Sequence, residues 1–176
     1  HSQTIDESCS TEPFERGWIT DREGVLTAVK DGTRWQIDGL PRIYVDTQGG
    51  LLDLLIPSDF AQRRELFFTY AKRQGLRGSG TAVYRARLSE DGQRLEKGTT
   101  IFQIARGTGG GYHWGARLVE APDGHLFVTI GDRGNGDLSQ DLSMHNGSVL
   151  RITRDGDAPA DNPFVGQRGK LDEIWS

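Results

Sequence analysis

The residues best suited to proton transfer lie in a glycine-rich segment of the second half of the chain. Glycines occupy positions 107 and 109–111, His113 follows, and Asp132 comes after a short β-prone run. Glycine lets the backbone approach a flat ligand closely and leaves an imidazole edge accessible. A histidine takes up a proton near neutral pH, and a carboxylate on its other ring nitrogen fixes the tautomer and stabilises the imidazolium. The segment therefore indicates a general base, His113, with Asp132 as its partner.

A hairpin is the element that would bring these two side chains together. Asp123-Gly124 is a strong two-residue hairpin signal, and it lies midway between the pair, since (113 + 132)/2 is 122.5. Both side chains would then stand at one end of the sheet. The alternative is that His113 caps a glycine-rich turn while Asp132 forms an Asx-turn with Gly134, and the spacing leaves both readings open.

Gln48 is a second candidate for ligand binding. It precedes Gly49 and Gly50, and these lead into an apolar run that begins at Leu51. A polar side chain beside two glycines suits a backbone bend beneath a planar ligand. The same pattern is also typical of an ordinary strand entry.

Several familiar ligand motifs are not favoured by their spacing. The glycines of 107–111 lack the Gly-Lys-Ser/Thr ending of a phosphate loop. The acidic run 132–141 has calcium-loop composition without EF-hand spacing, and turn-forming residues explain it better. A zinc set is not expected from His113, His125 and His145, because His125 is predicted to face solvent. Asn146-Gly147-Ser148 matches a glycosylation acceptor, but Asn-Gly is first a turn signal.

The elements around these residues are predicted to be β-strands. Asp-Gly pairs are turn signals, and they stand at 31–32, 38–39, 91–92, 123–124 and 155–156, the last three at even spacings of 32 residues. Short β-prone runs lie between them at 17–20, 25–29, 66–70, 81–88, 100–105, 126–130 and 148–153. Alternation in 83–88 indicates a strand with one solvated face. A single helical turn capped by Ser58 is expected in 58–65. The pattern predicts an all-β sandwich, barrel or propeller, and repeats of about 40 to 50 residues would favour the propeller.

Composition narrows the classes of function. The chain has 176 residues, a formal net charge of -4, 24 glycines and one cysteine. A single cysteine excludes an internal disulfide, and the acidic balance without a basic block argues against nucleic acid as a partner. Apolar runs of only a few residues predict no transmembrane helix, so a soluble or already processed chain is expected. Residues 1–16 show no period and are expected to be a surface segment or partly disordered.

Beyond composition, the sequence resembles the soluble PQQ-dependent aldose sugar dehydrogenases, the glucose/sorbosone dehydrogenase family. The resemblance runs in order from about Gly17 to Ser176. The segments that carry it are Gln48-Gly-Gly-Leu-Leu-Asp53, Pro57-Ser-Asp-Phe60, Gly115-Ala-Arg117-Leu-Val, Pro122-Asp-Gly124, Phe127-Val-Thr-Ile-Gly-Asp-Arg-Gly134, Val149-Leu-Arg-Ile-Thr-Arg-Asp-Gly156 and Pro159-Ala-Asp-Asn-Pro163.

The resemblance implies a six-bladed β-propeller, with about three blades in residues 17–176. It implies that His113 is the general base that removes the C1 hydroxyl proton of an aldose while hydride passes to pyrroloquinoline quinone (PQQ). Asp132 would orient His113, and Gln48 would contact the cofactor. The resemblance also implies a calcium ion, an external electron acceptor and a periplasmic or secreted location.

The resemblance covers only about half of a family member. The segments that supply the calcium ligands and further cofactor-binding basic residues are expected beyond Ser176, so the isolated chain is expected to be inactive. Ser148 stands where the family usually has lysine. We expect a piece of a longer enzyme; a homodimer that closes the ring, or a partner chain that supplies the missing half, are the alternatives. A non-enzymatic propeller module that binds carbohydrate or protein, and a half-ring active only after assembly, are the rival functions.

Overall fold

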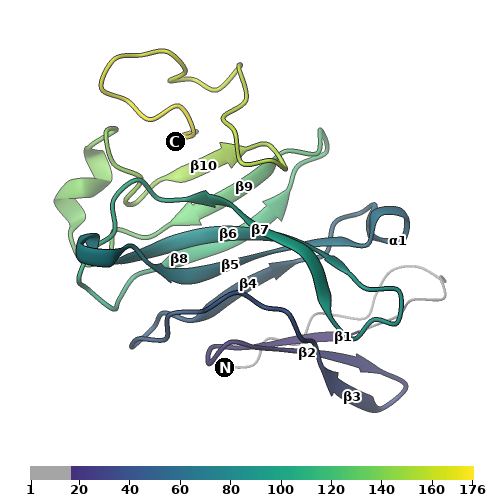
Figure 1. Cartoon of the computed structure of the whole chain (residues 1–176). Helices are drawn as coiled ribbons and strands as arrows, with labels where there is room; N and C mark the ends of the chain where they lie inside the picture. Colours follow the sequence, from purple (N-terminus) through teal and green to yellow (C-terminus); the bar gives the residue numbers. More distant parts are fainter. Residues whose placement is uncertain (1–16) are drawn as a thin grey trace.

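The computed structural model describes residues 17–176, which form three antiparallel β-sheets side by side (Figure 1). The first sheet contains β1 (Gly17–Asp21), β2 (Val25–Lys30) and β3 (Thr33–Gln36). The second contains β4 (Leu51–Leu55), β5 (Glu65–Arg73), β6 (Ser79–Leu88) and β7 (Leu95–Gln103). The third contains β8 (Gly115–Glu120), β9 (Leu126–Ile130) and β10 (Val149–Ile152). The expected all-β class is confirmed, and each sheet is one blade of a propeller.

The helical content is small. It consists of α1 (Phe60–Arg63) and the two 3₁₀ turns η1 (Gly75–Arg77) and η2 (Gly136–Gln140). The expected turn in 58–65 is present, but its N-cap is Asp59 without a side-chain cap hydrogen bond, so the predicted Ser58 cap is wrong. The backbone N–H of Ser58 instead donates to the Glu120 carboxylate. No helix among residues 17–176 is long and apolar enough to cross a membrane.

The middle sheet is buried on both faces. In β5, Leu66 and Phe68 pack in a core shared with the first sheet, whereas Phe67 packs in a second core shared with the third sheet. Successive strand side chains point to opposite faces, so β5 reads as a nearly continuous apolar run. The predicted solvated face of 83–88 is therefore wrong in part, because Val83 is fully buried under the third sheet and only Arg85 and Arg87 reach its edge.

The Asp-Gly pairs have different roles. Asp31-Gly32 joins β2 to β3 with both residues at positive φ, and Asp123-Gly124 lies in the turn between β8 and β9. Asp91-Gly92 turns β6 into β7, and Asp155-Gly156 turns the chain after β10. The hairpin expected at 38–39 is absent: Asp38 instead forms a bridge to Arg94 of the second sheet.

The unit of repetition is the blade and not the 32-residue spacing. Pairs 31–32 and 91–92 each join the last two strands of their sheets, and pair 155–156 follows β10, the last strand of the third sheet. The intervals between these pairs are 60 and 64 residues (91 − 31 and 155 − 91). The pair 123–124 belongs to a different hairpin of the third sheet. These intervals are longer than the repeats of about 40 to 50 residues that would favour a propeller on sequence alone. At the end of the chain, Ile174 pairs with Leu150 and extends the third sheet. The expectation for residues 1–16 lies outside the described residues.

Candidate active site

The hairpin of β8 and β9 brings His113 and Asp132 together. His113 stands two residues before β8, and Asp132 stands two residues after β9. The Nδ1 atom of His113 lies 2.7 Å from the Oδ1 atom of Asp132. The mouth of the hairpin is closed by the backbone bond from the Gly131 N–H to the Trp114 carbonyl. This end of the sheets also carries η1 and η2, opposite α1 in Figure 1.

The Asp132 carboxylate is held in its charged form. Its Oδ1 atom accepts a hydrogen bond of 2.9 Å from the Gly134 N–H as well as the contact with His113. These two interactions hold the pKa of the Asp132 carboxyl below its usual range. A charged carboxylate accepts the Nδ1 proton of the imidazole, so the lone pair of the neutral ring lies on Nε2. The His113 side chain is 59% exposed, which leaves that atom accessible. The Asx-turn alternative is thus present together with the His–Asp pair, since Asp132 serves both.

Gln48 joins this pair from the segment before β4. Its Oε1 atom accepts a hydrogen bond of 2.9 Å from the His113 backbone N–H, and its own backbone N–H donates to the Gly111 carbonyl at 3.0 Å. The Gln48 side-chain amide nitrogen has no hydrogen-bond partner within residues 17–176. The structure therefore brings together all three predicted residues, from two different sheets.

A buried arginine that the sequence pattern did not single out holds the glycine-rich segment in place. Arg133 is only 4% exposed, and its guanidinium lies over the Trp114 ring, 3.4 Å from the ring centroid. It donates to the Tyr112 carbonyl at 2.7 Å and to the Gly110 carbonyl. Burial lowers the pKa of Arg133 to about 10, which still leaves it charged at neutral pH. Trp114 follows His113 in the sequence and Arg133 follows Asp132, and this position beside the two candidate residues was the available signal. No local sequence pattern pairs Arg133 with Trp114, however.

Two glycines permit the close packing at this site. An added Cβ at Gly49 would lie 2.6 Å from the Trp114 ring, and one at Gly131 would lie 1.9 Å from the His113 carbonyl oxygen. Both separations are too short for any side chain. These positions place Trp114 under the Gln48 segment and keep His113 against the end of β9.

The remaining candidates have structural roles. His145 is 3% exposed; its Nδ1 atom accepts the Ala105 N–H at 3.0 Å, and its Nε2 atom lies 3.3 Å from Glu173. His125 contacts Asp123 and Arg151, so it is not the purely solvent-facing residue expected. Asn146 is 1% exposed and is followed by Gly147 at positive φ, which agrees with the turn reading. Residues 17–176 contain no cluster of three or more His, Cys, Asp or Glu side chains arranged to hold a metal ion.

Comparison with known proteins defines the class. Residues 9–176 match the Glucose / Sorbosone dehydrogenase family, and the chain belongs to that family.

Individual relatives agree with this assignment. The chain is 33% identical over 174 residues to the aldose sugar dehydrogenase YliI of Escherichia coli (strain K12), an alignment that covers 93% of this chain and 47% of the relative. A glucose dehydrogenase crystal structure superposes with a TM-score of 0.87 at 35% identity, over 94% of this chain and 49% of that one. The PQQ-bound aldose sugar dehydrogenase of Streptomyces coelicolor gives a TM-score of 0.78 at 25% identity, over 93% and 47% of the two chains. The chain spans about half the length of the relatives it matches.

Proposed function

We propose that this chain contributes half of the active site of a PQQ-dependent dehydrogenase that oxidises aldose sugars at C1. The observation that carries the proposal is the 2.7 Å contact between His113 Nδ1 and Asp132 Oδ1 at the mouth of one hairpin. Family membership supplies the reaction class, and a PQQ-bound structural neighbour supplies the cofactor. His113 is the proposed general base, Asp132 its orienting carboxylate and Gln48 the proposed cofactor contact.

The residues at the rim fit the chemistry of this cofactor. PQQ presents carboxylate and carbonyl oxygens, which are hydrogen-bond acceptors, and the rim offers donors. The Gln48 side-chain amide is one of them, and the backbone N–H groups of Gly110, Gly111 and Tyr112 make no hydrogen bond within residues 17–176. Glycine at two of these positions leaves the backbone open to a flat ring. Gln48 and the 110–112 amides would therefore hold the cofactor.

The proton chemistry follows from the tautomer of His113. Because Asp132 accepts the Nδ1 proton, the free Nε2 lone pair is available to take the C1 hydroxyl proton of the sugar. The imidazolium that forms is stabilised by the charged carboxylate 2.7 Å away. When bound, PQQ supplies the oxidant that accepts the C1 hydride. Loss of that hydride and of the hydroxyl proton leaves a carbonyl at C1.

We propose that further parts of the complete enzyme are supplied from outside these 176 residues. We place the calcium ligands beyond residue 176, and the reduced cofactor passes its electrons to an external acceptor. We propose a periplasmic or secreted location, on the family resemblance alone. The remaining blades come from further polypeptide or from a second copy of the chain. Light scattering at micromolar concentration distinguishes these two sources of the remaining blades, because a purely monomeric mass rules out the second copy.

Dye reduction by aldoses in the presence of PQQ and calcium tests the function. A complete ring that contains this chain is expected to turn over, and the 176 residues alone are not. His113→Ala should abolish turnover with the fold intact. Asp132→Asn should lower kcat more than it raises KM, because it alters the base and not the pocket. Arg34→Ala, at an exposed position on β3, is the matched control.

A result of unchanged turnover in His113→Ala would exclude the proposed base. Saturable sugar binding by the complete ring without any dye reduction would instead favour the non-enzymatic carbohydrate-binding module. Binding is measured by calorimetry on the same preparation, so the two outcomes are distinguished directly.

A further inference from the structure

A pocket lies beside the glycine-rich segment and is not used by the proposed mechanism. It has a volume of about 200 Å³ and is lined by Tyr44, Arg73, Gly78, Ser79, Thr108 and Gly109. These residues come from three segments: the stretch before β4, the end of β5 with the start of β6 and the turn between them, and the stretch after β7. Its Gly109 is four residues before His113, so the pocket adjoins the segment that carries the proposed base.

Arg73 is the charged group of this pocket. Its guanidinium lies over the Tyr44 ring, 4.4 Å from the ring centroid. The side chain is exposed and makes no hydrogen bond or ion pair within residues 17–176. Stacking on the ring restrains the orientation of the planar guanidinium while its N–H donors stay available. The Asp46 carboxylate is bonded to hydroxyls and not to Arg73: one of its oxygens accepts the Tyr44 hydroxyl at 3.2 Å and the other accepts the Thr47 hydroxyl.

Three further polar groups of the pocket lack partners. The Ser79 hydroxyl and the Gly109 backbone N–H make no hydrogen bond within the described part of the chain. The Thr108 hydroxyl oxygen is buried and likewise unpaired. Buried polar groups are normally hydrogen-bonded, and an unpaired one calls for an explanation. A bound acceptor group would satisfy donors from the guanidinium, the hydroxyls and the amide together.

The donors and the volume define the class of ligand. All of these groups donate to oxygen, and the single guanidinium carries one positive charge in a planar fork that matches a carboxylate. The fork also matches a phosphate, but a phosphate carries nearly two negative charges against the single positive charge of this site, so a carboxylate is the better match in charge. Complete small-molecule sites usually exceed about 300 Å³, so a pocket of about 200 Å³ accepts one end of a ligand and not the whole molecule.

We propose that this pocket binds the carboxylate of an acidic saccharide, such as a uronic acid unit. Arg73 makes a bidentate contact with the carboxylate, and Ser79 and the Gly109 N–H complete the site. The assignment of the ligand as a saccharide rests on the proposed function. An acidic sugar unit bound in this pocket would belong to a saccharide whose reducing end lies toward His113. The carboxylate site itself stands on the pocket alone.

Calorimetric or NMR titration of the full chain with sodium glucuronate, sodium acetate, glucose and inorganic phosphate tests the site without the cofactor. Glucuronate and acetate should bind, with glucuronate tighter, and glucose should not displace acetate. Arg73→Ala should weaken glucuronate binding about tenfold or more, and Arg73→Lys should weaken it less, because the charge stays while the fork is lost. Arg34→Ala, which removes an exposed arginine elsewhere, should change affinity less than twofold.

A second variant blocks the pocket without touching its charge. A Cβ at Gly109 meets nothing within 4 Å, so Gly109→Val should fold normally, occupy the pocket and abolish binding. Gly136→Val is the control, because a Cβ there also meets nothing within 4 Å. Carboxylate binding that survives both Arg73→Ala and Gly109→Val, or no carboxylate binding at all, would overturn the proposal. Tighter binding of phosphate than of glucuronate would overturn the carboxylate assignment.

The outcomes separate this site from the proposed function. Arg73-dependent binding of both acetate and glucuronate supports the pocket even if the complete ring fails to reduce the dye. Binding of acetate with no added affinity for glucuronate would refute the saccharide part alone. If the complete ring with Gly109→Val still reduces the dye with neutral aldoses but loses activity with uronic acid substrates, the result supports both the proposed function and the carboxylate pocket.

Discussion

At the scale of single residues, the candidate site is organised before any ligand binds. His113 is restrained through its ring by Asp132 and through its backbone N–H by the Gln48 side chain. The loop that precedes it is held by Arg133, which bonds two of its carbonyls and lies over Trp114. Side chains whose orientation is set in this way lose less freedom when a substrate binds, which favours catalysis. His113 and Arg133 both have positive φ, so the segments before β8 and after β9 have backbone strain that these contacts must outweigh.

Arg133→Met should release this loop. The substitution leaves the Tyr112 and Gly110 carbonyls without their donor and removes the charge from the Trp114 face. We expect the free energy of unfolding to fall by about 2–3 kcal/mol in chemical denaturation. The imidazole N–H proton signal of His113 should also weaken in the NMR spectrum, as its contact with Asp132 loosens.

Two further variants give this prediction its controls. Arg133→Lys retains the charge and should recover part of the loss, whereas Arg168→Met, at an exposed position, should change stability by less than about 0.5 kcal/mol. An unchanged His113 signal in Arg133→Met, despite reduced stability, would show that Arg133 is structural without positioning the base.

At the scale of elements, the mouth of the β8–β9 hairpin determines the distance between base and carboxylate. The two strands pair from Gly115 opposite Ile130 to Glu120 opposite Leu126, with an irregularity between Gly115 and Leu118. Beyond the mouth, the Arg133 N–H donates to the His113 carbonyl. The backbone of Gly131 lies close against the His113 carbonyl and leaves no room for a side chain.

Gly131→Ala should force this mouth apart. The added Cβ would lie 1.9 Å from the His113 carbonyl oxygen, which requires a backbone shift. We expect a loss of about 3 kcal/mol in the free energy of unfolding, typical of severe overpacking, together with loss of the His113–Asp132 contact. Gly136→Ala, where a Cβ meets no atom within 4 Å, should be close to neutral. Equal stability of the two variants would show that the mouth is not tightly closed.

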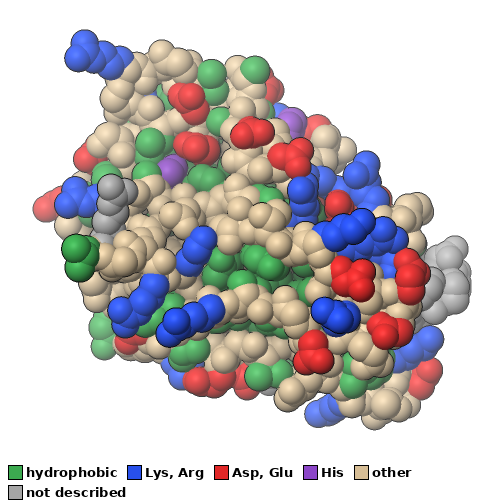
Figure 2. All heavy atoms as spheres, viewed as in Figure 1, with side chains coloured by type: hydrophobic (Ala, Val, Ile, Leu, Met, Phe, Trp, Pro, Cys, Tyr) green, Lys and Arg blue, Asp and Glu red, His purple; other side chains and the backbone are tan. Residues whose placement is uncertain are grey.

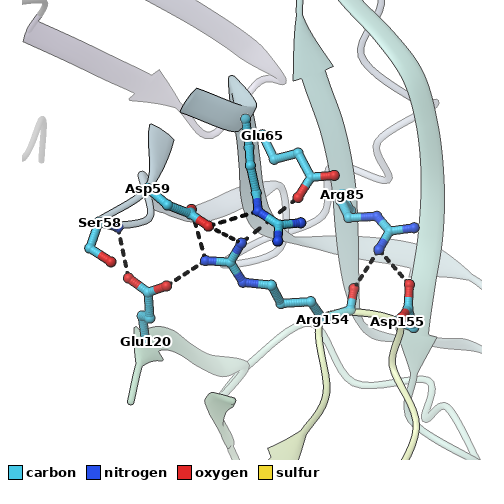
Figure 3. A network of polar contacts seen from close by, with 8 residues as sticks. Ser58, Asp59, Glu65, Arg85, Glu120, Arg154 and Asp155 are labelled. Atoms are coloured by element: carbon cyan, nitrogen blue, oxygen red, sulfur yellow. Dashed lines mark hydrogen bonds and ion pairs between the residues drawn. The ribbon is translucent and has the colours of Figure 1, made fainter. Parts of the chain in front are cut away.

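At the scale of the whole molecule, charged groups join the sheets at the end opposite the candidate site. Figure 2 shows acidic and basic side chains mixed at this end, over α1. Arg154, after β10, bonds both oxygens of Asp59 at 2.9 Å and the Glu120 carboxylate at 2.5 Å (Figure 3). Arg85 of the middle sheet donates to the Arg154 carbonyl and to Asp155. One arginine therefore ties the third sheet to the connection between β4 and β5.

This cluster predicts a loss of stability in acid. The Arg154 guanidinium holds the pKa of Asp59 below its usual range; for Glu120, burial opposes the shift, but the Ser58 N–H and Arg154 outweigh it and lower the pKa. A carboxyl whose pKa is lower in the folded state stabilises the fold above its unfolded pKa, near 4, and this contribution is lost as pH falls through the folded value. The free energy of unfolding should therefore decrease as pH falls below about 4.

Arg154→Met tests the origin of this pH dependence. Without the guanidinium, the two carboxyls should titrate closer to their usual range, so the variant should be less stable at pH 7 and its stability should fall less steeply in acid. Chemical denaturation at pH 7, 5, 4 and 3 measures both effects, with Arg168→Met as the control. A variant whose acid profile parallels that of the unchanged chain would place the acid sensitivity elsewhere, for example at Asp132 or Glu173.

Local sequence predicted most strands and turns, and it offered the pairing of His113 with Asp132 as one of two alternatives. Turn chemistry at Asp123-Gly124 and the period-two pattern depend on neighbours along the chain, and a hairpin needs nothing more to place its two ends together. Contacts between distant segments were decided only by tertiary structure. They are the hydrogen bond from the His113 N–H to Gln48, the stacking of Arg133 on Trp114 and of Arg73 on Tyr44, and the burial of Val83 against the third sheet. These join segments of different sheets or loops, whose packing depends on how whole blades stack and not on the spacing of residues within one of them.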